Sequence, residues 1–190
     1  MISPEQLDSL LVEWHRVSHK ADAFFDRVYQ AQRAAMRCAP GCSQCCRAEL
    51  TVTLVEALAL LRGLLTLLPD ARRRLADDAA RAAAACALLS DDRCLLYAWR
   101  PTICRTHGLP VAETSGEIGC CPLNFVDEIP ADAVLDGRLL GTMLGVADDL
   151  LRQRLRLEAS CRILVRDLVR EGSAALPVDV RRQLDAAAML

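Results

Sequence analysis

The chain has 190 residues, of which 53% are hydrophobic and 25% are charged, and its formal net charge is −2. This length favours a single domain over residues 1–190 with a sizeable core. The charge balance argues against nucleic acid as a partner, because nucleic-acid-binding proteins usually carry a basic stripe. The sequence has no run of about 20 apolar residues to span a membrane and no basic-then-apolar leader. We therefore expect a cytoplasmic protein, and its oligomeric state stays open.

The sequence predicts a long N-terminal helix over residues 1–37. Ser3 is a capping residue, Pro4 suits the first helical turn, and Gln6 completes a capping box. Apolar residues then recur three and four positions apart, which gives one buried seam for core packing or self-association. The seam consists of Leu7, Leu10, Trp14, Val17, Ala21, Phe24, Val28, Ala31 and Ala35. The helix is expected to run directly into Cys38.

Two further helices and a strand are expected before the middle of the chain. They are an extended piece over residues 49–52, a helix to about residue 68, and a helix over about residues 71–85. Thr53 and Glu56 form a second capping box at the start of the first of these helices. Pro69 ends it, and Asp70 caps the next one.

Regular periodicity disappears between residues 86 and 130, where glycine and proline punctuate the chain. A structureless loop of this length is unusual in a compact domain, so we expect its cysteines to fasten it. Helices return over residues 131–190: one begins near Ala131 or Asp136 and runs to about Glu171 with at most one break, Gly172 ends it, and Pro177 opens a last short helix. The predicted fold class is all-α: a helical bundle with a long irregular cysteine-rich loop region clipped by metal. The pairs Asp91–Asp92 and Asp148–Asp149 are expected in a turn and on a helix face.

The ten cysteines are the most unusual feature of the sequence. They are Cys38, Cys42, Cys45, Cys46, Cys86, Cys94, Cys104, Cys120, Cys121 and Cys161. In a cytosolic chain they are poor candidates for disulfides, because the cytosol keeps thiols reduced. Cys161 stands apart from the others and is expected to act as a small hydrophobic residue.

The sharpest motif is the run Cys38-Ala-Pro-Gly-Cys42-Ser-Gln-Cys45-Cys46. Its Pro-Gly pair predicts a tight turn that brings the first three thiolates toward one point, which is how soft metal sites are built. The same spacing holds a [4Fe–4S] cluster in radical S-adenosylmethionine enzymes, but the βα barrel of those enzymes is absent from the predicted elements. The motif therefore indicates a metal or cluster site and does not by itself indicate radical chemistry.

More cysteine motifs follow: Cys86-x-x-Leu, Cys94-x-x-Tyr, Arg100-Pro-x-x-Cys-Arg, and Cys121-Pro-Leu-Asn-Phe. From Cys38 to Phe125 the sequence resembles the YkgJ-like CxxCxxCC family of cysteine-cluster proteins, which is named as a zinc- or iron-chelating domain. The first gap of this chain is one residue longer than in the family name. The doubled Cys120–Cys121 leaves open which of the two matches, and we favour Cys121 because it directly precedes Pro-Leu-Asn-Phe. The resemblance implies metal binding.

The candidate metal ligands are eight cysteines: Cys38, Cys42, Cys45, Cys46, Cys86, Cys94, Cys104 and Cys121. Eight thiols exceed the four that a structural zinc requires, so either two metals or one polynuclear cluster with additional thiols is expected. Neighbours such as Cys45 and Cys46 point about 100° apart in a helix, so both rarely serve one ion. Four arginines flank candidate ligands and could offset thiolate charge: Arg37, Arg47, Arg93 and Arg105.

Other side chains carry weaker signals. His15 and His19 have the spacing of a two-histidine metal face, but they fall away from the apolar seam and are expected in solvent. His107 lies in the clipped loop, where it could be a ligand, a proton donor or a turn residue. Tyr97 and Asn124 could line a pocket beside the metal, or could serve packing and turn capping.

The sequence contains no nucleophile–base pair, phosphate loop or paired-carboxylate motif, so catalytic residues and enzyme status stay open. We expect a metal-binding cysteine-cluster protein whose cofactor is an iron–sulfur cluster ([4Fe–4S]) or Zn. Its use would be electron transfer or modification of a partner protein. The alternatives are a zinc-binding helical module for protein interaction, and metal delivery or sensing. Some relatives in the resembling family are flagellin lysine methylases, an activity that we do not extend to this shorter chain.

Overall fold

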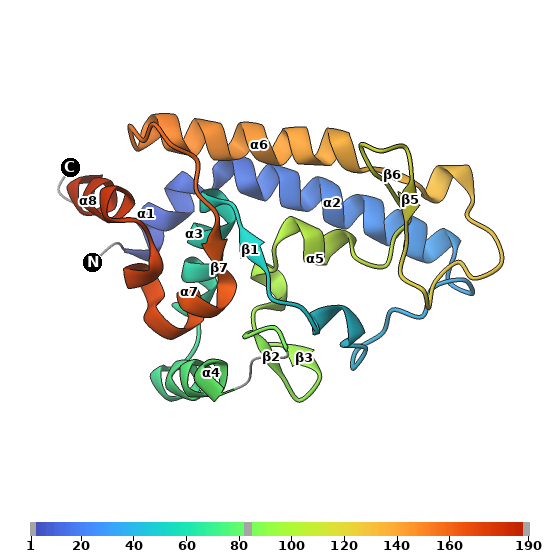
Figure 1. Cartoon of the computed structure of the whole chain (residues 1–190), viewed down its shortest axis with the longest axis horizontal. Helices are drawn as coiled ribbons and strands as arrows, with labels where there is room; N and C mark the ends of the chain where they lie inside the picture. The colour runs from blue at the N-terminus through green and yellow to red at the C-terminus, as the bar shows by residue number, and fades with distance from the viewer. Residues whose placement is uncertain (1–2, 82–84, 188–190) are drawn as a thin grey trace.

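The computed structural model describes residues 3–81 and 85–187 of the chain (Figure 1). Its helices are α1 (Pro4–Leu10), α2 (Val12–Ala31), α3 (Leu54–Leu64), α4 (Pro69–Arg81), α5 (Thr102–Thr106), α6 (Gly137–Arg154), α7 (Val165–Glu171) and α8 (Val178–Ala187). None of the helices in these ranges has the length and apolar character to cross a membrane. Parts of two expected helices, residues 82–84 and 188–190, lie outside the described residues.

Short strands join segments that are far apart in the sequence. They are β1 (Thr51–Val52), β2 (Leu89–Ser90), β3 (Arg93–Cys94), β4 (Val111–Ala112), β5 (Ile118–Gly119), β6 (Leu135–Asp136) and β7 (Ile163–Leu164). Antiparallel β1–β7 and β2–β3 pairs and a mixed β5–β4–β6 sheet result. The all-α prediction is therefore corrected to a mainly helical fold with small sheets. The strands arise because backbone groups in the irregular segments need hydrogen-bond partners.

The expected N-terminal helix is two helices and ends early. The capping box of Ser3 and Gln6 is present. Leu11 separates α1 from α2, and its side chain is fully buried. The second helix stops at Ala31 rather than reaching Cys38, and the following turn offers the carbonyl of Ala35 to the backbone N–H of Phe125 at 2.8 Å. At this point a hydrogen bond to the distant loop of Phe125 takes the place of further hydrogen bonds within the helix.

Two buried carboxylates fix the start of α3 between its neighbours. Glu56 completes the predicted capping box with Thr53, and its second oxygen accepts the backbone N–H of Thr102 at the start of α5 (2.9 Å). Asp148 of α6 accepts the backbone N–H of Val55 at 2.9 Å. Asp148 lies on a face of a helix, α6, as expected, and this position is buried because its carboxylate is placed at the positive end of α3.

Helix boundaries elsewhere differ from expectation by a few residues. The helix expected to reach residue 68 ends at Leu64, and Pro69 begins α4, so Asp70 lies in its first turn rather than at its cap. The long C-terminal helix is broken into α6 and α7 by β7, and Gly172 at φ 60° ends α7 as expected. Proline suits a first helical turn because its backbone carries no N–H to leave unsatisfied.

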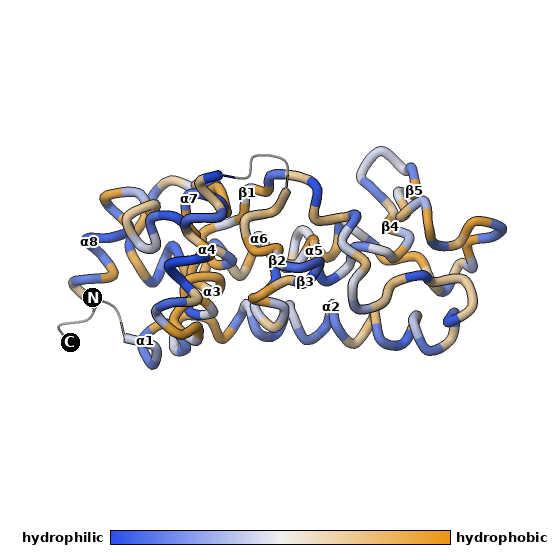
Figure 2. Tube along the Cα trace, turned by 90° about the horizontal axis from the view of Figure 1, so that it is seen from below, coloured by the Kyte–Doolittle hydropathy of each residue, from blue (hydrophilic) through white to orange (hydrophobic). Residues whose placement is uncertain are grey.

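The larger hydrophobic core lies at the end of the molecule that holds both termini (Figures 1 and 2). It gathers apolar side chains from α1, α3, α4, α6, α7 and α8. At its edge Trp14 of α2 stacks on Trp99 with ring centroids 6.0 Å apart. Gly63 permits this contact, because a Cβ there would lie 2.7 Å from the Trp99 ring. Cys86 and Cys94 pack against this larger core.

A smaller second core forms where α2 ends. Its buried residues are Val28, Met36, Leu109, Phe125, Ala133 and Leu135. Two cysteines, Cys38 and Cys120, pack against it rather than against the larger core. The cysteine-bearing segments are thus attached to two separate hydrophobic clusters.

Candidate metal centre

The eight candidate cysteines form two neighbouring sets. We call Cys46, Cys86, Cys94 and Cys104 the inner thiol group, and Cys38, Cys42, Cys45 and Cys121 the outer thiol group. Within each set the thiols lie close enough that a charge on one changes the pKa of another. Charge on Cys45 also raises the pKa of inner thiols, so this residue lies between the sets. All ten cysteines of the chain are free thiols.

Backbone contacts assemble the inner thiol group from three segments. The backbone N–H of Cys86 donates to the carbonyl of Cys46 at 2.7 Å, which ties the opening motif to the loop before β2. Cys94 lies on β3, where its backbone pairs with Leu89. Cys104 is on α5, which packs along α2. These contacts bring the segments next to one another, and the assignment of their cysteines as metal ligands stays a prediction.

Two inner thiols receive the same local backbone contact. The N–H of Leu88 hydrogen-bonds to Cys86, and the N–H of Leu96 hydrogen-bonds to Cys94, which lowers the pKa of each thiol against the larger opposing effect of burial. In both cases the donor is two residues beyond the cysteine, and its leucine side chain is buried. Amide hydrogen bonds to sulfur stabilise thiolates and tune metal centres. The Cys-x-Leu pattern therefore places a thiolate-stabilising amide beside each of these sulfurs.

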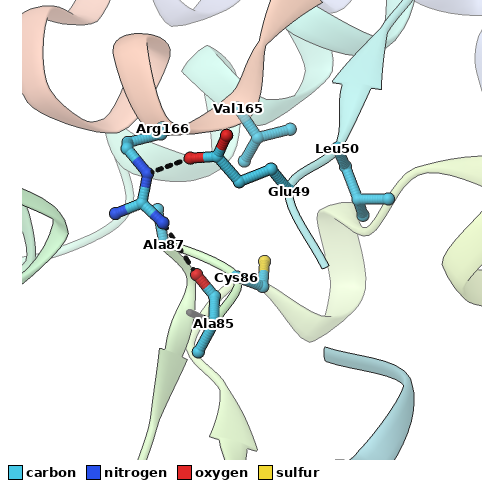
Figure 3. A pocket seen from close by; sticks show the side chains of 7 residues that line it. All are labelled: Glu49, Leu50, Ala85, Cys86, Ala87, Val165 and Arg166. Carbon is cyan, nitrogen blue, oxygen red and sulfur yellow. Dashed lines mark hydrogen bonds and ion pairs between the residues drawn. The ribbon is translucent and has the colours of Figure 1, made fainter. Parts of the chain in front are cut away.

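Arg166 of α7 lies beside a candidate ligand and was not among the candidates taken from the sequence. Its guanidinium donates to a Glu49 carboxylate oxygen at 2.5 Å and to the carbonyls of Ala79 and Ala85 at 2.5 and 2.9 Å. Figure 3 shows Arg166 beside Cys86, at a cavity of about 10 Å³. Its charge lowers the pKa of the Cys86 thiol. This arginine follows the last candidate ligand by many residues, so no local motif indicates it.

Two arginines outside the expected flanking set act on the inner thiols: Arg100 and Arg166 lower the pKa of Cys94 and Cys86, respectively. Of the expected flanking residues, Arg105 is 4% exposed, shares the Asp22 carboxylate with Arg100, and interacts with the charge of Cys104. The other three predicted residues, Arg37, Arg47 and Arg93, are exposed.

Burial keeps the inner thiols protonated in the metal-free chain. It raises the pKa of Cys46 to about 12 and that of Cys104 to about 12, and neighbouring thiols add to both shifts. Burial is also the main reason that the pKa of Cys86 and Cys94 is raised. A cation bound among these sulfurs would supply the charge that makes their thiolate forms favourable.

Asn124 organises the outer thiol group. It is 3% exposed, and its amide nitrogen donates to the Cys38 sulfur at 3.3 Å and to the Gly108 carbonyl at 2.7 Å. Its amide oxygen accepts the backbone N–H of Arg37 at 2.7 Å. A Cβ on Gly108 would lie 2.6 Å from the Cys38 sulfur, so glycine is needed for this close approach. Asn124 is therefore buried and hydrogen-bonded to two other segments, and its place in a pocket beside a metal stays a prediction.

The doubled cysteine pair divides between two environments. Cys120 packs against the smaller core, and its thiol donates weakly to the carbonyls of Asn124 and Gly108 at 3.9 and 4.0 Å. Charge on Cys121 raises the pKa of Cys38, after the larger effect of burial. Cys121 remains our proposed ligand of the pair.

The weaker candidates, three histidines and Tyr97, differ in how exposed their side chains are. His19 is exposed as expected, whereas His15 is half-buried with its ring centroid 6.0 Å from Trp99, so the solvent prediction is wrong for it. His107 is exposed at the end of α5, and its proposed functional roles stay predictions. Tyr97 is 61% exposed beneath the Arg100 guanidinium.

Cys161 packs against the larger core, near acidic side chains of α6 and α8.

Within residues 3–81 and 85–187, no three histidine, cysteine, aspartate or glutamate side chains are gathered as a metal-ion site. The candidate ligands are neighbours in two sets, and they do not already converge on a single point. Their donor chemistry, sulfur supported by amide N–H groups and arginine, fits a soft metal or an iron–sulfur cluster.

The helical fold and the free thiols place this chain among cysteine-rich proteins with metal-binding donor sets. Residues 37–122 match the model of the CxxCxxCC family, described as "Putative zinc- or iron-chelating domain". This segment belongs to that family, so the resemblance expected from the sequence is confirmed, and the segment includes all eight candidate ligands. No curated protein and no solved structure matches the chain.

Metal binding by these thiols should strengthen steeply as pH rises. Each thiol must lose its proton to become a ligand, and the pKa values of Cys46 and Cys104 lie near 12. For a set of four protonated thiols, the logarithm of the apparent association constant should rise with pH at a slope approaching four. Competition titration of Co²⁺ against a chelator at several pH values between 6.5 and 8.5 measures this slope. A slope near zero would show that the thiols are not the ligands.

Proposed function

We propose that the chain is a cytoplasmic iron–sulfur protein whose inner thiol group holds a [4Fe–4S] cluster. The observation that carries this proposal is the set of contacts around four half-buried thiols from three chain segments. Two of the thiols receive backbone N–H bonds, and two arginines lie beside them. Four thiolates on a 2+ cluster leave a net charge of −2, and Arg100 and Arg166 oppose it. Such contacts to sulfur are the means by which proteins set cluster potentials.

The bound cluster would supply one-electron redox chemistry, and the chain's own residues would position and protect it. Leu88 and Leu96 are 2% exposed, and their amides bond to the thiols of Cys86 and Cys94. Arg166 links α7 to the segments before β1 and β2 through its bonds to Glu49 and Ala85. We propose electron transfer or modification of a partner protein as the use of such a centre.

Anaerobic purification followed by iron, sulfide and zinc analysis and visible absorption tests this proposal. We expect a brown protein whose absorption bleaches on reduction by dithionite. A matched pair of variants, Cys94→Ser in the inner group and Cys161→Ser outside both groups, separates the site from general thiol effects. The first should lose the chromophore and the second should keep it. A colourless protein with stoichiometric zinc would overturn the cluster assignment.

The second candidate is a zinc-stabilised helical module that binds another protein. It is favoured by the way the inner thiol group joins three segments with little regular structure between them. A structural zinc can contribute about 10–16 kcal/mol to folding. This candidate expects full zinc occupancy in aerobically and anaerobically purified protein and no response to dithionite.

A further inference from the structure

The opening cysteine motif is attached to the β2–β3 hairpin by a side chain that is not a candidate ligand. The Ser43 hydroxyl donates to the Asp92 carboxylate at 2.5 Å, across 49 residues of sequence. Ser43 is 6% exposed, whereas Cys42 and Cys45 on either side of it are exposed. A buried hydroxyl between two exposed cysteines therefore forms a contact between distant segments of the chain.

Ser43 is also the point where two turns of the motif meet. The first turn closes with a hydrogen bond from the N–H of Cys42 (3.0 Å), and the second with one from the N–H of Cys46 to the Ser43 carbonyl (2.9 Å). Ser43 occupies the cap position of the 3₁₀ turn Gln44–Cys46, but its side chain makes no capping hydrogen bond. The side-chain oxygen of a capping serine usually accepts a backbone N–H of its own turn. Here the hydroxyl bonds to Asp92 instead, so this contact fixes the joint between the two turns.

The turn of the hairpin places Asp92 for this contact. Ser90 pairs with Arg93, so Asp91 and Asp92 are the two residues of the loop, and their φ values are 48° and 57°. Two positive φ values are those of a type I′ turn, in which glycine is favoured. Of the two aspartates, Asp92 is the one that accepts the Ser43 hydroxyl. The loop thus presents a carboxylate at a position where glycine would satisfy the backbone alone.

A second hydrogen bond attaches the other end of residues 43–46. The N–H of Cys86, just before β2, donates to the Cys46 carbonyl at 2.7 Å. Cys94 lies on β3 of the same hairpin. One contact at each end therefore holds the segment with Cys45 and Cys46 beside the segment with Cys86 and Cys94.

We propose that Asp92 and Ser43 are positioning residues for the metal centre. Their hydrogen bond holds the turn of residues 44–46 against the hairpin in the metal-free chain, so that its cysteines are in place when metal arrives. They act through the turn and not as ligands. This inference rests on the proposal that these cysteines bind metal. Groups that orient metal ligands typically contribute about 10- to 100-fold to metal affinity.

Titration of the reduced, metal-free full-length chain with Co²⁺ against a chelator tests this role, because thiolate-bound cobalt absorbs visible light. Asp92→Gly removes the acceptor and suits the positive φ, and Asp91→Gly is its matched control, since it removes the same charge from the same turn. The apparent association constant for Co²⁺ should fall about 10- to 100-fold in Asp92→Gly and less than about twofold in Asp91→Gly. Ser43→Ala should fall as far as Asp92→Gly, and the double variant should fall no further. Asp92→Asn, which keeps an acceptor oxygen and tolerates positive φ, should recover part of the loss.

Hydrogen exchange in the metal-free chain measures the positioning without cobalt. The amides of Cys46 and Cys86 are both hydrogen-bonded at this junction. They should exchange about tenfold faster or more in Asp92→Gly, the effect of losing a hydrogen bond to a charged group. In Asp91→Gly they should exchange as in the wild type. Circular dichroism checks that each variant keeps its helices.

Equal losses of cobalt affinity in the two glycine variants would show that charge, and not the contact, is responsible. That result would overturn the positioning inference and would leave thiol metal binding intact. Unchanged exchange at Cys46 and Cys86 in Asp92→Gly would overturn it as well. The absence of any cobalt–thiolate absorption in the wild type would instead overturn the proposed function, and this role of Asp92 and Ser43 with it.

Discussion

Removal of the bound metal should release residues 86–130 from the rest of the molecule while α2 and α6 stay folded. That segment contains one five-residue helix and two-residue strands, so backbone structure alone gives it little support. Its attachments to the rest of the chain include the bond between Cys86 and Cys46 and the bond between Thr102 and Glu56. Thiolate ligation can be worth about 10–16 kcal/mol of folding free energy.

Hydrogen-exchange mass spectrometry before and after anaerobic chelation measures this release. Amides in 86–130 should lose at least a hundredfold in protection, whereas those in the interior of α6 should change by less than threefold. Chelated Cys161→Ser protein should behave as the wild type does, since that thiol lies outside both groups. Unchanged protection in 86–130 would show that packing, and not metal, holds the loop.

Substitution of Arg105 should destabilise the protein by about 3 kcal/mol even without metal. This side chain is 4% exposed, and it bonds to Asp22 and to the carbonyls of Arg100 and Ala98. Arg105→Met removes the donors and leaves two carbonyls and a carboxylate with fewer partners. Because Cys104 is the preceding residue, the same change should weaken metal binding at the inner thiol group.

Chemical denaturation of the metal-free wild type and variant measures the free energy of unfolding. Arg93→Met is a matched control: it also flanks a candidate ligand, but its side chain is exposed, and its effect should lie within about 0.5 kcal/mol. Arg105→Lys should recover only part of the loss, because lysine lacks the planar fork that reaches several acceptors. Equal effects of the Arg105 and Arg93 substitutions would contradict the structural role.

Local signals in the sequence predicted local structure well. Both capping boxes, at Ser3 and at Thr53, are present, because each depends on residues three positions apart. The turn at Asp91–Asp92 is present between β2 and β3, where both residues have positive φ. That the eight candidate cysteines are metal ligands stays a prediction.

Features that depend on contacts between distant segments were not predictable in this way. The buried role of Asp148 depends on an N–H of α3, and the role of Arg166 depends on carbonyls near Cys86. The break at Leu11 was hidden because the apolar seam continues across it. In each case the structure depends on a residue in another helix or loop. A single sequence does not show which distant residues lie close together in the fold.

The pairing of β1 with β7 has a consequence for the order in which the protein matures. Thr51 pairs with Leu164, and this contact brings α7 and its Arg166 to the loop that carries Cys86. During synthesis these partners are separated by more than a hundred residues, so the contact forms only after Leu164 has left the ribosome. The inner thiol group therefore gains its second arginine late, and we expect the metal loading proposed for it to follow that contact.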